Sequence, residues 1–99
     1  MNKTDMLNVM LQLHVGKDNK TPRTELCASA GYNDRKLREI IAQLREDGKL
    51  ICNTDGGYYL AQTLDEVEEY YWREKKRAIS IFEALRPFRK VLREGGRRV

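Results

Sequence analysis

The chain has 99 residues, which is enough for one domain with a single modest core. Apolar residues make up 40% of the sequence and charged residues 34%, and no apolar run approaches the roughly 18 residues that a membrane span requires. The first residues include no apolar stretch of the kind found in signal peptides, so we expect a cytoplasmic protein without a membrane partner.

The formal net charge of +4 is unevenly distributed along the chain. Residues 1–72 contain nine Lys or Arg and twelve Asp or Glu, a net charge of −3. Residues 73–99 contain ten Lys or Arg and three Asp or Glu, a net charge of +7. This asymmetry indicates that the C-terminal third faces a polyanion or an acidic partner, although a solvated helix face is also compatible with it.

The first predicted helix is capped by Thr4 and ends at Gly16. Its expected inward face consists of residues at helical spacing, Leu7, Met10, Leu11 and His14. The polar residues 17–20 that follow are expected to form a loop or a very short edge strand.

Two further helices are predicted on either side of a tight turn. Thr21 as N-cap and Pro22 as first helical residue open a short helix that Gly31 ends. Asn33 caps the third helix, which ends at Asp47 and Gly48. The apolar stripe of this third helix consists of Leu37, Ile40, Ile41 and Leu44.

A β-hairpin and a long helix complete the chain. Strand-like runs at residues 49–53 and 58–61 flank Asp55-Gly56, a dipeptide typical of tight hairpins. Residues 63–66 form a capping box that opens a helix running to about Arg86, where Pro87 must kink or break it. We therefore divide the chain into a domain of residues 1–62 and a C-terminal helix with a basic tail, residues 63–99.

A short helix, a glycine-containing turn and a longer helix form a helix-turn-helix unit, and here a hairpin follows it directly. Through the segments Thr24–Ile41, Leu44–Gly48 and Gly56–Leu60, the sequence resembles the winged helix-turn-helix family. The whole is similar to small phage-encoded or prophage-encoded members with an extra C-terminal helix. The resemblance implies a mainly α fold with a small β-hairpin: a winged helix-turn-helix plus a long C-terminal helix.

The resemblance also implies that the third helix enters the major groove of double-stranded DNA. Arg35 and Arg38 are candidates for base edges or phosphates, because a guanidinium binds guanine through two hydrogen bonds. Lys36 suits a phosphate. The predicted DNA-binding residues are Arg23 and Thr24 in the second helix, Asn33, Arg35, Lys36, Arg38 and Gln43 in the third, and Lys49, Asn53 and Thr54 in the wing.

Other features of the same region favour a different partner. Residues 34–47 carry four basic and four acidic side chains, and Arg35 can pair with Glu39 at i,i+4 spacing. The hairpin tip carries Asp55 where the family usually has a basic residue. Two functions thus stay open: DNA binding by a dimeric phage or prophage transcriptional regulator or replication accessory, and a protein–protein interaction module such as a phage inhibitor of a host enzyme.

Apolar residues of the last helix recur at coiled-coil spacing, every seventh residue from Leu64 to Leu92. A helix that reaches Pro87 is about 35 Å long, more than a small domain covers, so we expect homodimerisation, with fold-back at Pro87 as the alternative. The predicted dimerisation residues are Tyr71, Ala78, Ile81, Phe82, Leu85, Phe88 and Leu92. The basic residues on the polar side of this helix suit phosphates.

No combination of residues predicts catalysis. His14 is alone on an apolar face, and Cys27 and Cys52 lack metal-ligand spacing and are expected to fill the core. The carboxylates within residues 66–69 lie where the helix dipole favours them, and the aromatic residues 70–72 are expected to pack rather than to stack on bases. We expect no enzymatic activity, no metal and no cofactor.

Overall fold

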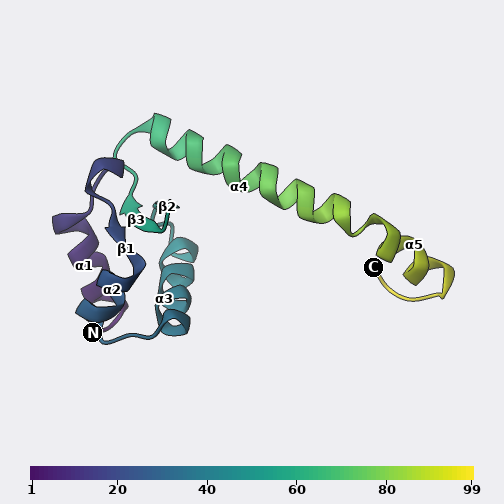
Figure 1. Ribbon diagram of the computed structural model, residues 1–99, viewed down its shortest axis with the longest axis horizontal. Coiled ribbons are helices and arrows are strands. Elements are labelled where there is room, and N and C mark those ends of the chain that lie inside the picture. The colour runs from purple at the N-terminus through teal and green to yellow at the C-terminus, as the bar shows by residue number, and fades with distance from the viewer.

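The computed structural model describes all 99 residues and contains five α-helices, one 3₁₀ turn and a three-stranded antiparallel sheet. The elements are α1 (Lys3–Leu13), η1 (Lys17–Asn19), β1 (Thr21–Pro22), α2 (Arg23–Ala30), α3 (Asp34–Glu46), β2 (Ile51–Thr54), β3 (Gly57–Leu60), α4 (Leu64–Ala84) and α5 (Arg86–Glu94). Figure 1 shows the elements from α1 to β3 gathered in one body, from which α4 leads away. The fold class expected from the sequence is confirmed, with a third strand added. None of the helices combines the length and the apolar character needed to cross a membrane.

The core lies between α1, α2, α3 and the sheet. Its buried residues are Met6 and Met10 of α1, Leu26 of α2, Leu37, Ile40, Ile41 and Leu44 of α3, and Ile51 and Leu60 of the sheet. The apolar stripe predicted for the third helix is therefore confirmed. Because this stripe occupies only one side of α3, the other side of the helix stays open to solvent.

α1 begins earlier than the sequence analysis predicts. Asn2 rather than Thr4 is the N-cap: its side-chain oxygen accepts the Asp5 N–H (2.8 Å), and the Asp5 carboxylate accepts the Asn2 N–H (3.1 Å). This reciprocal pair satisfies two N–H groups that the helix start leaves free. The buried face is built on Met6 and Met10, and the inward position predicted for Leu11 is wrong, since Leu11 is 55% exposed.

Thr21 and Pro22 form strand β1, not the helix start predicted for them. They pair antiparallel with β3, Thr21 opposite Tyr58 and Pro22 opposite Gly57, in a sheet of order β1-β3-β2. Pro22 is tolerated because β1 is an edge strand. α2 begins at Arg23, whose N–H donates to the carbonyl oxygen of Gly56 (3.1 Å). The second helix is thus attached directly to the hairpin.

The turns that shape the helix-turn-helix and the wing are those predicted. Gly31 ends α2 in the left-handed conformation (φ 70°), and the Asn33 side chain accepts the Lys36 N–H (2.8 Å) at the start of α3. β2 and β3 are joined by Asp55 and Gly56, whose φ values of 44° and 77° are typical of a type I′ turn. These local signals place the turn between α2 and α3 and the tip of the hairpin.

α4 begins with contacts to the domain. Thr63 accepts the Glu66 N–H (3.2 Å), as predicted for a cap, but the Glu66 carboxylate does not return to Thr63. Instead it accepts the N–H groups of Gln62 (2.8 Å) and Lys17 (3.0 Å). The Lys17 ammonium lies 2.9 Å from the Glu69 carboxylate, which raises the pKa of Lys17. The start of α4 is thereby attached to η1.

The rest of α4 and all of α5 extend away from the domain, which gives the molecule dimensions of 53 × 30 × 23 Å. The helix breaks at Leu85, with Pro87 in the first turn of α5, so the predicted interruption near Pro87 is confirmed. The alternative of a fold-back onto the domain is not what the structure adopts, because neither α4 nor α5 has a buried residue. The basic tail begins with a turn that closes α5, in which the Arg97 N–H donates to the Leu92 carbonyl oxygen (2.7 Å).

Candidate nucleic-acid interface

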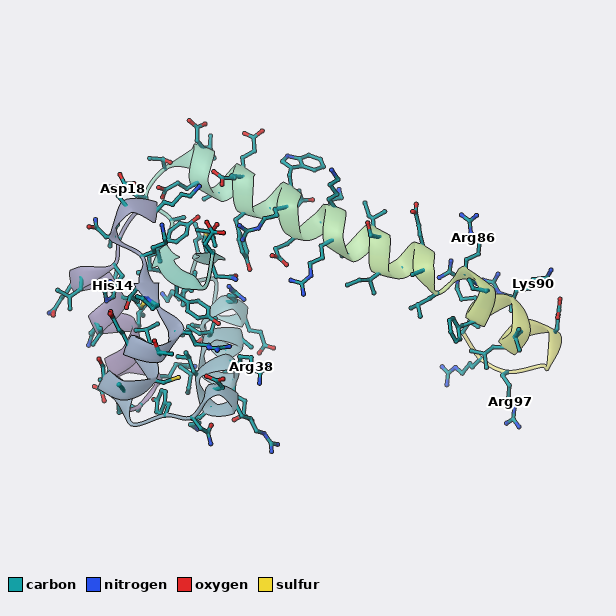
Figure 2. All side chains as sticks on the ribbon, viewed as in Figure 1. His14, Asp18, Arg38, Arg86, Lys90 and Arg97 are labelled. Atoms are coloured by element: carbon teal, nitrogen blue, oxygen red, sulfur yellow. The ribbon has the colours of Figure 1, made fainter.

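The open side of α3 carries the predicted basic residues at its N-terminal end. Arg35, Lys36 and Arg38 are all exposed, and Figure 2 shows Arg38 projecting from the body beside α3. Gln43 is exposed as well, and its spacing of seven residues from Lys36 places the two on the same side of the helix. α4 passes the C-terminal end of α3 and does not pack along the helix (Figure 1), so the N-terminal turns of α3 are accessible.

Part of the charge on this face is already paired. The Arg35 guanidinium lies 3.3 Å from the Glu39 carboxylate, the i,i+4 pair anticipated from the sequence. Arg23 of α2 lies 3.3 Å from the Asp34 carboxylate, a pair between two helices that the sequence did not indicate. Lys36 and Arg38 make no ion pair within the chain. They are the two α3 cations free to meet an external anion.

The wing and the start of α2 enclose a shallow hollow of about 360 Å³. It is lined by Pro22, Arg23, Thr24, Asn53, Gly56 and Tyr58. Three predicted DNA-binding residues, Arg23, Thr24 and Asn53, thus meet in one place. Thr54 is half-buried and follows Asn53 on the same strand. Lys49 is exposed but lies before β2, outside the hollow, so the structure does not bring it together with the others.

Two predicted contact residues also have structural roles. The Asn33 oxygen caps α3 through its bond to the Lys36 N–H. The Asn53 side-chain oxygen accepts a bond from Arg45 (3.3 Å), and its carbonyl oxygen accepts one from Arg73. The side-chain NH₂ group of each amide makes no hydrogen bond within the chain and stays available as a donor.

Arg45 is the residue that sequence reasoning missed. Its Nε donates to the Ile51 carbonyl oxygen (2.8 Å), and its guanidinium lies 5.3 Å from the centre of the Tyr70 ring. The Arg73 guanidinium lies at the same distance from that ring. Burial raises the pKa of Tyr70. These contacts connect the end of α3, strand β2 and helix α4. The only feature of the sequence that could have indicated this role is the position of Arg45 in the last turn of the predicted third helix.

The aromatic residues after Tyr70 are on the surface. Tyr71 and Trp72 are 52% and 56% exposed and contact each other edge to face, with ring centres 5.2 Å apart. The Lys75 ammonium lies 5.4 Å from the first ring and 5.0 Å from the second. The packing role expected for residues 70–72 therefore fits Tyr70 and not its two neighbours.

The distal end of the molecule is strongly basic. Arg86, Lys90 and Arg97 project outward from the α5 region in Figure 2. Arg89 differs from them, because its guanidinium lies 4.0 Å from the centre of the Phe82 ring and donates to the Phe82 carbonyl oxygen (2.6 Å). The predicted dimerisation residues on α4 and α5 are all exposed.

Residues with catalytic or metal-binding potential are scattered. His14 lies at the end of α1, with Nδ1 2.9 Å from the Asn19 carbonyl oxygen. Cys52 is buried and Cys27 half-buried, both are free thiols, and burial raises the pKa of each. Burial also raises the pKa of Tyr59 to about 12. No three His, Cys, Asp or Glu side chains lie close enough together to hold a metal ion.

No family model, curated protein or solved structure matches the chain.

Proposed function

We propose that this protein belongs to the winged helix-turn-helix family and binds double-stranded DNA in a sequence-specific or semi-specific manner. The supporting observation is the open face of α3, where Lys36 and Arg38 are exposed and unpaired next to a wing. A helix presented in this way fits the major groove. The C-terminal helix leaves this face accessible (Figure 1).

In the proposed complex, the first turns of α3 meet base edges. Arg38 contacts a guanine or a phosphate. Arg35 also contacts the DNA, after its ion pair with Glu39 breaks. Breaking this pair costs little free energy because ion pairs between exposed side chains are weak. The hollow containing Arg23 and Thr24 lies over the phosphate backbone, together with the free amide donor of Asn53. These contacts position the protein, and those of α3 select the sequence.

The proposed cellular role is that of a phage or prophage transcriptional regulator or replication accessory in the cytoplasm, acting as a dimer and without catalysis, metal or cofactor. Dimerisation is supported by the exposed apolar residues of α4 and α5, among them Phe82 and Phe88 at 60% and 66% exposure. Two copies would present two α3 helices to paired half-sites.

A protein–protein interaction module is the second candidate, and one observation favours it. Two of the basic residues near α3 are already paired with Asp34 and Glu39, and the wing tip carries Asp55, so the charge that faces outward is small. In that case α3 and the wing would bind another protein, such as a host enzyme inhibited by a phage, and basic α5 would bind an acidic surface of it.

Selection from a random duplex library separates the two candidates. The full chain is immobilised, bound duplexes are amplified over several rounds, and the pool is sequenced. We expect an enriched motif that is lost when Arg35 and Arg38 are both replaced by Ala. Recovery of no motif together with no retained duplex would reject the DNA-binding proposal in favour of the protein-binding one.

A further inference from the structure

Charge changes sign along α4 and α5. The first two turns of α4 carry four carboxylates, Asp65, Glu66, Glu68 and Glu69, and no basic residue. α5 carries four basic residues, Arg86, Arg89, Lys90 and Arg93, and a single carboxylate, Glu94. Glu66 and Glu69 already contact Lys17, so Asp65 and Glu68 are the carboxylates that remain unpaired. They and basic α5 are electrostatically complementary, yet they cannot meet within one chain because α4 holds them apart (Figure 1).

An apolar surface that the chain does not cover runs between these two ends. Leu64 is 80% exposed, Tyr71 52%, Phe82 60% and Leu85 46%. Near α5, hollows of about 460 and 280 Å³ are lined mainly by apolar side chains, Phe88 and Leu92 contributing to both. Exposed apolar surface of this extent in a small protein indicates a binding partner.

The attachment of α4 to the domain leaves this surface free. The residues half-buried at the start of α4 are Glu66, Val67, Tyr70 and Glu74. Leu64 and Tyr71 stand three and four residues from Val67, on the same broad face of the helix, yet both stay exposed at the edge of the contact with the domain. After Glu74 every residue of α4 is exposed, so a partner helix can cover the apolar side chains from Ala78 onward and reach Tyr71 and Leu64 beside the domain.

We propose that two copies of this chain pair along α4 and α5 in antiparallel orientation, with basic α5 of one copy beside the acidic start of α4 of the other. A parallel pair would place like charges together at both ends, which is unfavourable. The middle of the acidic segment is near residue 67, and that of the basic segment is near residue 90. When the acidic segment of each copy lies beside the basic segment of the other, the Ala78 residues of the two copies lie opposite each other at the centre of the pair. Ala78 is the smallest side chain of the stripe and allows the helices to approach closely.

This inference rests on the proposed self-association and adds its orientation. It separates the two domains: with Ala78 at the centre, the Leu64 positions of the two copies lie roughly 40 Å apart along the helix axes at 1.5 Å per residue. Two α3 helices held by such a pair would contact half-sites more than one helical turn of DNA apart.

Disulfide trapping in the full chain tests the orientation. Tyr71 and Leu85 face each other across the antiparallel pair, whereas two Tyr71 positions lie about 20 Å apart. A disulfide needs Cα atoms within about 7 Å. The variants are Tyr71→Cys and Leu85→Cys, oxidised singly and as an equimolar mixture. Both positions are exposed, so the core is unaffected. The wild-type chain, with Cys27 and Cys52, is the oxidation control, and digestion with mass spectrometry maps each bond.

We expect the mixture to yield a 71–85 disulfide at least five times more abundant than any 71–71 or 85–85 disulfide. Light scattering of the wild-type chain should give the mass of two copies at high concentration. A dimer that forms mainly 71–71 and 85–85 bonds would overturn the antiparallel orientation and leave self-association intact. The mass of a single copy at every concentration would overturn both, whereas the DNA-binding proposal is decided separately by the duplex selection.

Discussion

The Arg45 guanidinium lies 5.3 Å from the centre of the Tyr70 ring and joins the last turn of the candidate recognition helix to the C-terminal helix. The same guanidinium donates to the Ile51 carbonyl oxygen and to Asn53, so that one side chain connects α3, β2 and α4. Together with the contacts of Lys17 to Glu66 and Glu69, it sets the direction in which α4 leaves the domain. The accessibility of α3 therefore depends on a small number of polar contacts.

Replacement of Arg45 by Lys should destabilise the domain. Lysine keeps the charge but cannot reach Ile51 and Asn53 with two separate nitrogens, and it loses the planar contact with Tyr70. We expect the free energy of unfolding to fall by about 1–2 kcal/mol in urea titrations. Arg38→Lys is the matched control and should change stability by less than about 0.5 kcal/mol. Equal midpoints for the two variants would show that the Arg45 contacts do not stabilise the fold.

Glu66 should make stability depend on pH. Hydrogen bonds from the Gln62 and Lys17 N–H groups hold the pKa of its carboxyl below the usual 4.5. A carboxyl whose pKa is lowered by folding contributes stability above its unfolded pKa, and this contribution is lost as pH falls through the folded value. Glu66→Gln should therefore cost about 1 kcal/mol at pH 7, and the cost should shrink below pH 4.5.

Glu68→Gln provides the control for this pH effect, because Glu68 is exposed and makes no hydrogen bond or ion pair. Thermal unfolding of both variants and the wild type between pH 3 and pH 7 gives the comparison. A stability loss of Glu66→Gln that is the same at every pH would contradict this prediction. It would show that the two N–H groups do not stabilise the negative charge of the Glu66 carboxylate.

The parts of the fold that local signals determine could be predicted from the sequence. Gly31 and Asn33 act on their own neighbours, so the turn between α2 and α3 followed from residue type. Thr21 and Pro22 are equally suited to a helix start and to an edge strand, and only pairing with β3, more than 30 residues away, decides for the strand. The path of α4 likewise depends on a contact between Arg45 and Tyr70 that no local pattern encodes.

The candidate site was predictable to the same degree. Exposure of Arg35 and Arg38 and the pair with Glu39 follow from helical spacing alone. The pair between Arg23 and Asp34 joins two helices and needs the angle between them, which the sequence does not give. The sequence therefore predicted one more unpaired cation at the site, Arg23, than the structure shows.

Asp55 at the wing tip should weaken DNA binding. Asn tolerates the positive φ of this turn at least as well as Asp, so Asp55→Asn should leave stability within about 0.5 kcal/mol of the wild type. Loss of one negative charge near phosphates should tighten duplex binding roughly two- to fivefold at low salt. Fluorescence anisotropy measures the affinity, with Glu83→Gln on α4 as a charge-matched control that should have little effect. A wing that stays away from DNA would give the same affinity for both variants.

Arg35 and Arg38 should contribute to sequence preference and not only to affinity. On a duplex obtained by selection, the double replacement of both by Ala should weaken binding at least tenfold more than on a random duplex, since each base contact contributes about 1–3 kcal/mol of discrimination. The matched control replaces Arg23 and Thr24, which are proposed to contact phosphates, by Ala and should weaken binding to both duplexes equally. An equal loss on both duplexes for the α3 variant would limit α3 to phosphate contacts.

The most direct test of DNA binding is a titration of random duplex DNA with the wild-type chain at several salt concentrations between 50 and 200 mM. Protein that neutralises several phosphates releases their counterions, and the logarithm of the affinity then falls linearly with the logarithm of salt, at a slope of about −0.9 per phosphate. We expect a slope of about −4 or steeper. An absence of measurable binding at 50 mM salt would contradict the proposal that this protein acts on DNA.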